Sequence, residues 1–213
     1  MPSFARRSAI DGPAYTGLPI GFFAVALKLV TQLPISSMPF RTRQLTDETS
    51  LYEYAIGALA RRMRSVAELK RLMRNRVPKD ELGALLVECV IARLKEQKYL
   101  NDSSYAAAYA SFRRDNEKFG PRRVTTDLKI KGVHADVIEK TIKEAYSGVD
   151  EQELARGFLR RKRLKKPGSN REAARIFRAL MRAGFTSRTS ITILKNWDVD
   201  DELIAALEEE AGG

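Results

Sequence analysis

The residues best suited to covalent or metal chemistry in this chain are few and isolated. There is one cysteine, Cys89, and one histidine, His134, and their separation forms neither a metal-ligand spacing nor a nucleophile–base set. Acidic pairs beginning at Asp47 and Asp150 precede expected helices, where carboxylates favour the positive end of the helix dipole. Cys89 stands in an apolar helical run, which predicts a small buried side chain. We therefore expect no enzyme activity, no metal and no other cofactor.

The chemistry that the sequence favours is the binding of anions. The 213 residues carry a net charge of +11, which is unevenly distributed. Between Arg156 and Arg182 there are eleven lysines and arginines and one acid, whereas Asp198 to Glu210 contains seven acids and no base. This asymmetry indicates a directed surface for nucleic acid, for an acidic protein face or for a membrane surface.

Arginines recur on one side of an expected helix that starts near residue 170. On a helical wheel, Arg171, Arg175, Arg178 and Arg182 fall within about 60° of one another, opposite an apolar side that must pack inward. They would form an outward row about 16 Å long, whose mutual repulsion an anionic partner relieves. Two other expected helices carry similar rows, and a further basic cluster ends a preceding helix. The candidate contact residues for DNA or a protein–DNA filament are Lys70, Arg71, Arg74, Arg122, Arg123, Lys129, Arg160, Arg161, Arg163, Arg171, Arg175, Arg178 and Arg182.

The aromatic residues do not alternate with these basic residues in the way that a base-stacking surface requires. Their helical spacing instead predicts core positions, so we expect contacts to phosphate without base stacking or sequence readout. The aromatic residues assigned to the core are Tyr99, Tyr105, Tyr109, Phe112 and Phe119.

Similar short segments recur along the chain and indicate repeated elements. Asn75–Val77, Lys131–Val133 and Ala183–Phe185 each follow an amphipathic helical pattern, with offsets of about 56 and 52 residues. Gly132 and Gly184 suit the left-handed position that ends a helix, whereas Arg76 lacks that freedom, so the first repeat must end its helix differently. The helices before these segments have start signals of their own: a capping box at Ser65 and Glu68, Pro121 in a first turn, and Asn170 as a cap.

These signals predict an all-α fold of three tandem three-helix repeats forming an elongated, curved helical array. First helices are expected near residues 50–63, 102–118 and 150–165, and third helices near residues 79–98, 135–146 and 187–195, with a further turn or two over 200–209. The predicted boundaries are 49–100, 101–148 and 149–213, the last repeat ending in the acidic tail.

The amino-terminal residues differ from the repeats in their prolines and lack of periodicity. We expect residues 1–48 to be a disordered or mis-assigned extension, with Met38 as an alternative start. The apolar run over residues 18–30 is too short for a comfortable membrane span and has a weak polar face, so no membrane association is expected. The presence of a single cysteine suits a reducing compartment, so we expect the protein to be cytoplasmic. We also expect it to be a monomer.

Three stretches resemble motifs of the RecX family. Arg61–Leu69 is similar to R-R-x-x-S-x-x-E-L, Tyr99–Ala106 to Y-L-D-D-x-x-F-A, and Gly120–Val133 to G-x-x-R-I-x-x-E-L-x-x-K-G-I. The order of the three motifs makes the resemblance specific, and it covers residues 50–196. The chain departs from the family pattern where Asp, Glu and Gly are replaced by Asn101, Asp127 and Arg76.

The resemblance implies a regulatory protein that lies in the groove of the RecA–DNA filament. Such a protein inhibits RecA ATPase and strand exchange, limits filament growth, promotes disassembly and uses no cofactor. The resemblance also implies that Tyr99, Leu100 and Tyr105 lock one repeat onto the next, and that Asp102 caps the following helix.

Other interpretations of the residues stay open. A nucleic-acid-binding module that acts without a recombinase would use the same basic helices, because three-helix units resemble helix-turn-helix geometry in fold. The acidic tail from Asp198 to Glu210 would reduce DNA binding if it folded back onto the basic rows. An enzyme and a membrane-surface helix are the least supported interpretations.

Overall fold

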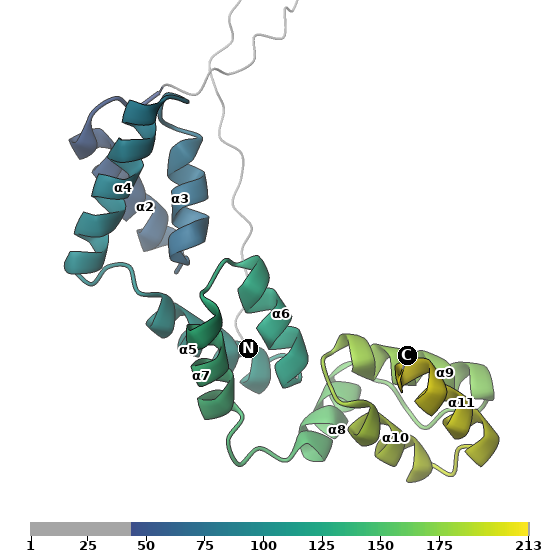
Figure 1. Ribbon diagram of the computed structural model, residues 1–213. Helices are drawn as coiled ribbons and strands as arrows, with labels where there is room; N and C mark the ends of the chain where they lie inside the picture. Colours follow the sequence, from purple (N-terminus) through teal and green to yellow (C-terminus); the bar gives the residue numbers. More distant parts are fainter. Residues whose placement is uncertain (1–43, 213) are drawn as a thin grey trace, which may run out of the picture. The chain divides into compact units, whose positions relative to one another are not determined.

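The computed structural model describes residues 44–212, and within these residues the chain is helical and has no strand (Figure 1). The all-α prediction is confirmed. The candidate start at Met38 and the apolar run 18–30 lie outside the described residues, as does most of the extension predicted over residues 1–48. The helices are α2 (Glu48–Arg61), α3 (Val66–Arg74), α4 (Glu81–Glu96), α5 (Asp102–Asp115), α6 (Pro121–Ile130), α7 (Ala135–Ala145), α8 (Glu151–Arg161), α9 (Asn170–Arg182), α10 (Ser187–Lys195) and α11 (Asp201–Gly212).

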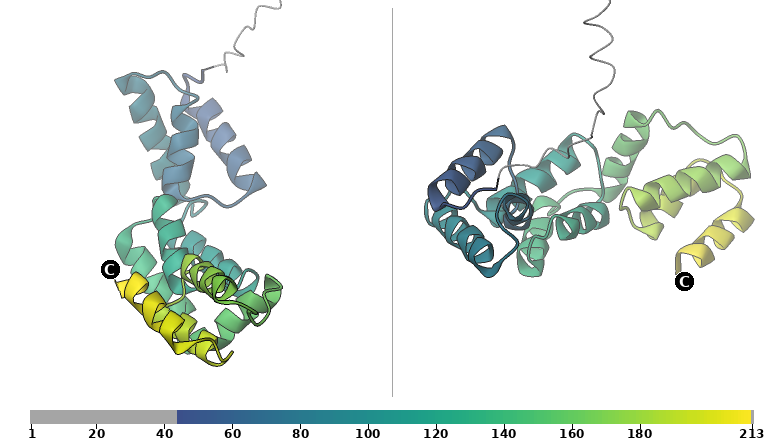
Figure 2. Two further views of the ribbon diagram at one scale, coloured as in Figure 1. Left: turned by 90° about the vertical axis from the view of Figure 1, so that its right-hand side faces the viewer. Right: turned by 90° about the horizontal axis from the view of Figure 1, so that it is seen from above.

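Buried side chains gather into three hydrophobic clusters, which define three helical units. The first unit comprises α2–α4, the second α5–α7, and the third α8–α11. The helices of each unit lie together in Figure 1 and in both views of Figure 2. Phe119 packs against the clusters of both the second and the third units. Representative buried residues are Leu51, Leu69 and Val90 in the first unit, Tyr105, Val124 and Leu128 in the second, and Phe158, Phe177 and Leu194 in the third.

Polar side chains start the helices where the sequence indicated. Asp47 Oδ1 accepts a hydrogen bond from Ser50 N at 2.8 Å, at the start of α2. Ser65 and Glu68 form the predicted capping box: Ser65 Oγ accepts from Glu68 N at 3.1 Å, and Glu68 Oε2 accepts from Ser65 N at 3.4 Å. These bonds satisfy amides that a first helical turn leaves without intrahelical partners. Pro121 occupies the first turn of α6, as expected.

Left-handed glycines end the middle helices of the second and third units. Gly132 has φ of 74° and Gly184 has φ of 90°. The next amide then turns back to the helix, with Val133 N donating to Leu128 O and Phe185 N donating to Leu180 O, both at 3.2 Å. Both glycine predictions are confirmed, since this closing bond needs a residue in the left-handed region. In the first unit α3 ends at the C-cap Asn75 in an ordinary right-handed conformation.

Some predicted helix ends were wrong by one to a few residues. The α8 helix stops at Arg161 instead of near residue 165, because Arg163 adopts φ of 55° and Leu164 N donates to Leu159 O at 2.9 Å. Ser169, not Asn170, caps α9. Asn101 caps α5, accepting from the amides of residues 103 and 104, so the cap that the family pattern assigned to Asp102 lies one residue earlier.

Several predicted core side chains are instead at the surface. Cys89 is exposed, because the buried stripe of α4 runs through Val87, Val90 and Ile91 and leaves residue 89 on the outer side. Tyr99 and Phe112 are 62% and 55% exposed. Helical spacing alone cannot distinguish a core position from the edge of a stripe, and this is where those predictions failed.

Candidate nucleic-acid interface

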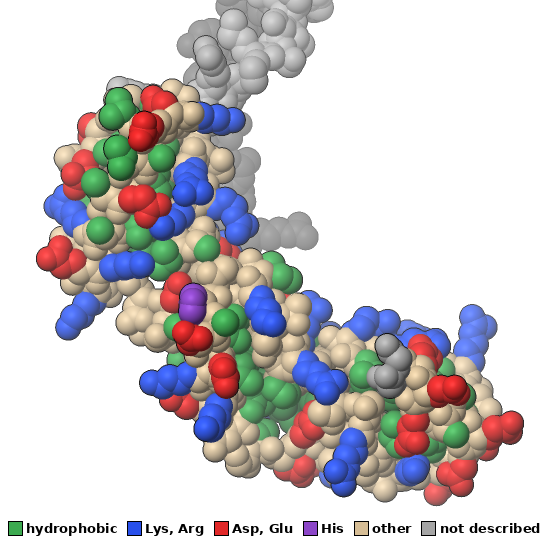
Figure 3. Space-filling model, viewed as in Figure 1, with side chains coloured by type: hydrophobic (Ala, Val, Ile, Leu, Met, Phe, Trp, Pro, Cys, Tyr) green, Lys and Arg blue, Asp and Glu red, His purple; other side chains and the backbone are tan. Residues whose placement is uncertain are grey.

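The arginine row of α9 lies opposite the core, as the helical wheel predicted. Ala173, Ile176, Phe177 and Leu180 are buried in the third cluster. The four arginines at residues 171, 175, 178 and 182 are all exposed. Figure 3 shows Lys and Arg side chains along the α9 edge of the third unit, with Asp and Glu gathered on the side of α10 and α11. The α9 helix therefore presents a positive face to solvent.

One arginine of this row is paired with the acidic tail. Arg178 Nε and NH2 donate to the two carboxylate oxygens of Glu210 on α11, each at 3.0 Å. The hydrogen bond from Arg178 lowers the pKa of Glu210, and the same bond raises the pKa of Arg178. Within residues 44–212 no ion pair involves Arg171, Arg175 or Arg182. The acidic tail thus neutralises one member of the row and leaves three exposed charges.

The basic row of α3 is more strongly neutralised within its own unit. Lys70 is half-buried and its Nζ lies 2.5 Å from Glu88 Oε2 on α4. Arg74 NH2 lies 3.8 Å from the other oxygen of the same carboxylate. Arg71 is exposed and forms no ion pair among the described residues. This row is therefore the weakest of the three as an anion-binding surface.

The α6 row combines an arginine held by a carboxylate with two cations that form no ion pair within residues 44–212. Arg123 Nε lies 3.1 Å from the buried Asp127 Oδ1, one turn further along the helix. Asp127 Oδ2 also accepts hydrogen bonds from Tyr109 OH at 3.1 Å and from Arg113 NH2 at 2.5 Å. Burial favours a lowered pKa for Arg113, but its hydrogen bonds to the carboxylates of Asp127 and Glu117 raise the pKa above its ordinary value. The remaining members of the row are exposed: Arg122 and Lys129.

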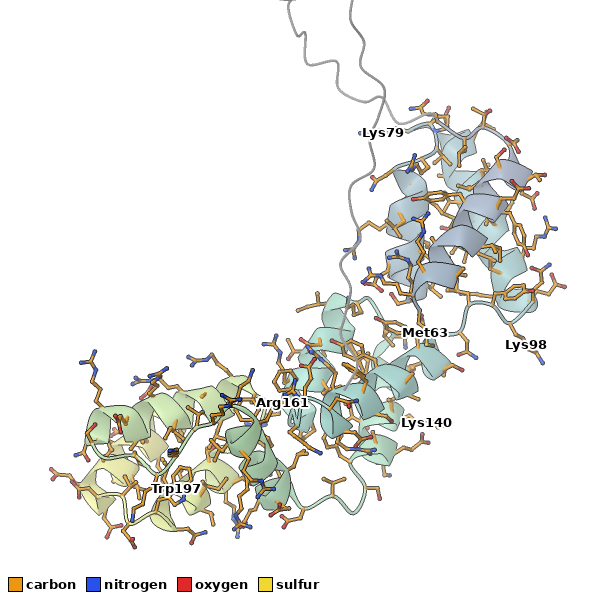
Figure 4. The ribbon with its side chains drawn as sticks, turned by 180° about the vertical axis from the view of Figure 1, so that it is seen from behind. Met63, Lys79, Lys98, Lys140, Arg161 and Trp197 are labelled. Atoms are coloured by element: carbon orange, nitrogen blue, oxygen red, sulfur yellow. The ribbon has the colours of Figure 1, made fainter. Side chains whose placement is uncertain are left out.

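The basic cluster after Gly157 contributes cations at the carboxyl end of α8. Arg160 NH2 lies 2.6 Å from Glu153 Oε1 on the same helix. Arg161 and Arg163 are exposed, and Arg161 is labelled in Figure 4 at the end of α8. Cations at this end complement the helix dipole as well as offering phosphate contacts. The role of each candidate cation in binding stays a prediction.

The middle helices α3, α6 and α9 meet end to end, which sequence reasoning did not predict. Ser65 Oγ, at the start of α3, donates to Lys131 O at the end of α6 at 2.5 Å. Gly120 N, at the start of α6, donates to Ala183 O at the end of α9 at 2.9 Å. Each joint brings a positive helix end to a negative one, so the two dipoles attract. The basic rows are therefore carried by three helices in series.

The joint between the first and second units contains a charged network around Glu68. Burial favours a raised pKa for Glu68. Lys131, whose Nζ is 2.7 Å from Glu68 Oε1, lowers the pKa, as do the Ser65 amide and Arg62. The net pKa of Glu68 is therefore below its ordinary value. Asp102 Oδ1 accepts from Val66 N at 2.8 Å. Asp102 thus caps α3 of the preceding unit, a role for which short-range sequence spacing carries no signal.

Comparison with known proteins identifies the family. The family model described as "RecX, second three-helix domain" matches residues 101–142. A protein of Myxococcus xanthus named "Regulatory protein RecX" is 33% identical over 161 residues, which cover 70% of this chain and 85% of that protein. The chain belongs to the RecX family. The protein of that name from Chromobacterium violaceum is also 33% identical, with 71% of this chain and 93% of the relative covered.

Other RecX proteins are longer than the matched region. The Bacillus pumilus protein is 32% identical over 136 residues, and this chain spans about half its length, 50%. Two solved RecX structures share the fold at 20% identity. One has a TM-score of 0.58 and covers 70% of this chain and 71% of the solved one. The other, from Lactobacillus salivarius, has a TM-score of 0.54 and covers 71% and 96%.

The RecX family match falls on the unit that connects the other two. Residues 101–142 comprise α5, α6 and most of α7, so they include the Asp102 cap, the Asp127 network and both ends of α6. In the part of the chain that the structure describes, no helix has the length and apolar character needed to cross a bilayer.

Proposed function

We propose that this RecX protein binds the RecA–DNA filament and regulates it, mostly by inhibiting RecA ATPase activity, strand exchange and filament growth. The family assignment supports a regulatory role, and the resemblance implies the filament as its target. The observation that carries the proposal is the exposed row on α9, in which Arg171, Arg175 and Arg182 are turned away from the core and form no ion pair with described residues.

The filament offers two kinds of partner for this row. DNA phosphates form charge-assisted hydrogen bonds with guanidinium groups, and acidic surfaces of the recombinase form the same type of contact. The end-to-end joints at Ser65–Lys131 and Gly120–Ala183 connect the three helices that carry the rows. The binding contributions of contacts on successive helices would then add along the repeating negative charges of the filament.

The test is ATP hydrolysis by RecA on single-stranded DNA with increasing amounts of the purified chain. The proposal predicts slower hydrolysis at substoichiometric to stoichiometric amounts. Reversing the charge of Arg171, Arg175 and Arg182 to glutamate should remove the inhibition and leave helicity unchanged by circular dichroism. A matched triple reversal of Lys79, Lys98 and Lys140, which are exposed on the first two units (Figure 4), should leave inhibition largely intact.

The outcomes separate this function from stand-alone nucleic-acid binding. DNA binding without an effect on RecA at any ratio would overturn the proposal and favour a module that acts without the recombinase. Inhibition that survives the α9 reversal would show that another surface meets the filament.

A further inference from the structure

A cavity of about 450 Å³ lies at the joint between the second and third units. Its size is within the range of small-ligand sites, about 300–1,000 Å³. Four cations surround it, from α6, from the end of α8 and from α9. Its apolar lining comes from both units. The residues that shape the site are Phe119, Phe158, Arg123, Lys162, Arg175 and Arg182.

The apolar part of the cavity includes two aromatic rings, which are held in place by packing. The rings of Phe119 and Phe158 have centroids 6.0 Å apart and are tilted by 41°. Phe158 also contacts Phe185 edge to face, with centroids 5.9 Å apart. The Arg113 guanidinium lies 4.8 Å from the Phe119 ring centroid. These contacts fix both rings before any ligand arrives. Phe158 is 5% exposed and supports the floor, and the half-buried Phe119 provides its accessible aromatic surface.

Most of the cations at the cavity form no ion pair with the residues that the structure describes. Arg123 is tethered to Asp127 at 3.1 Å. Among the described residues, no ion pair involves Lys162, Arg175 or Arg182, and all three are exposed. Placing unpaired like charges around one hollow is unfavourable until an anion enters. A cavity with an aromatic floor and a cationic rim suits a ligand that has a flat ring and a phosphate.

The joint that forms the cavity has a fixed backbone geometry. Gly120 N donates to Ala183 O at 2.9 Å and Arg122 N donates to Gly184 O at 3.3 Å. A Cβ on Gly184 would lie 2.2 Å from Arg123 N, so only glycine permits this approach. The two halves of the cavity are therefore held together by the main chain.

We infer that this cavity binds one unpaired nucleotide, with the base against the half-buried Phe119 at the floor and the phosphate between Arg175 and Arg182. The inference rests on the DNA contact in the proposed function and adds to it, since the basic rows alone predict no contact with bases. An acidic protein side chain would use the cationic rim but leave the aromatic floor empty. A paired base in a duplex presents no free face to the floor.

The test compares two labelled single strands of equal length, oligodeoxythymidylate and its abasic counterpart, by fluorescence anisotropy with the full chain. We expect the base-bearing strand to bind about fivefold or more tightly than the abasic strand. Ala179→Phe fills the cavity without changing charge and should abolish this preference while leaving abasic binding unchanged. Ala179→Leu, a smaller filler, replaces it if circular dichroism shows a loss of helicity.

A matched pair of charge variants tests the rim. Arg175→Gln with Arg182→Gln should weaken binding of both strands. Arg171→Gln lies on the same helix face but does not line the cavity, and should change the base preference by less than about twofold. Excess thymidine monophosphate distinguishes two sources of the nucleotide: displacement of the strand assigns the cavity to free nucleotides, and no displacement assigns it to a strand.

Equal binding of base-bearing and abasic strands by the unaltered chain would overturn the inference. So would a base preference that persists in a folded Ala179→Phe protein. Either result leaves the proposed function standing if the chain still slows RecA ATP hydrolysis. A retained base preference without any effect on RecA would instead reject the proposed regulation and support the cavity.

Discussion

Gly184 supports both the end of α9 and the approach of α6. Its φ of 90° is unfavourable for any residue with a Cβ, and a Cβ there would also lie 2.2 Å from Arg123 N. We expect Gly184→Ala to reduce the free energy of unfolding by about 2 kcal/mol or more, measured by urea denaturation. Gly148 has φ of 70° but nothing within 4 Å, so Gly148→Ala isolates the conformational cost. Equal losses in the two variants would show that the close approach is unimportant.

Glu68 makes the first joint sensitive to acid. Its pKa is lowered in the folded protein, because the contacts with Lys131, Ser65 and Arg62 outweigh burial. A lowered folded-state pKa means that this stabilisation is present above the unfolded-state pKa, about 4.3, and is lost as pH falls through the lower folded value. Glu68→Gln keeps a capping side chain but removes the charge, so it should cost about 1–2 kcal/mol at pH 7.

The measurement for Glu68→Gln is urea unfolding of both proteins at pH 7 and at pH 3. The difference in unfolding free energy should shrink at the lower pH, since the wild-type carboxyl is then increasingly protonated. A difference that does not change with pH would mean that the charge of Glu68 does not stabilise the joint.

Elements were predictable from sequence where the signal is local. The capping box at Ser65, the Pro121 helix start and the glycine ends at 132 and 184 all depend on residues a few positions apart, and all are present. Asp102 caps a helix that begins 36 residues earlier, and no local pattern records that contact. The prediction that Cys89 is buried was wrong for a related reason, since the exposure of this side chain depends on how α4 packs against its neighbours.

The candidate site was predictable in part on the same grounds. The wheel gave the outward direction of the α9 arginines, because the buried face of a helix follows from spacing alone. The pairing of Arg178 with Glu210 joins side chains 32 residues apart and depends on how α11 packs. The cavity at the second joint likewise needs the second and third units in contact. The sequence of a single helix is enough to predict a row of charges, whereas an ion pair or a cavity between helices depends on how two helices pack.

The α11 helix both completes a core and competes for the basic row. Ile204 and Leu207 are 2% and 3% exposed, so deleting the tail would expose the hydrophobic cluster of the third unit as well as remove the charge of the tail.

A single substitution is a cleaner test of autoinhibition by the acidic tail. Glu210→Gln frees Arg178, and we expect DNA affinity at low salt to rise about two- to threefold, measured by anisotropy. Glu209→Gln removes the same charge from an exposed neighbour and should have a smaller effect. Equal gains would point to net charge rather than to the Arg178 pair.

Across the molecule as a whole, cations that form no ion pair with described residues are distributed unequally among the three middle helices. The α3 row is largely neutralised by Glu88, whereas Arg122 and Lys129 of the α6 row are exposed. In the α9 row only Arg178 forms an ion pair with a described residue. If DNA binding is dominated by phosphate contacts, the affinity of the whole chain should fall with salt according to the number of contacts made. The third unit should then account for a large part of that dependence.

Neutralising the α9 row should lower the salt dependence by a definite amount. Replacing Arg171, Arg175 and Arg182 with glutamine should reduce the slope of log affinity against log salt by about two, because each phosphate contact with a single strand contributes about 0.7. The same number of charges removed at Lys79, Lys98 and Lys140 changes net charge equally but not the α9 face. That control should leave the slope nearly unchanged when both proteins are titrated from low to moderate salt. If the two triple variants gave the same slope, the chain would attract DNA through its overall charge, and the arrangement of arginines on α9 would have no part in binding.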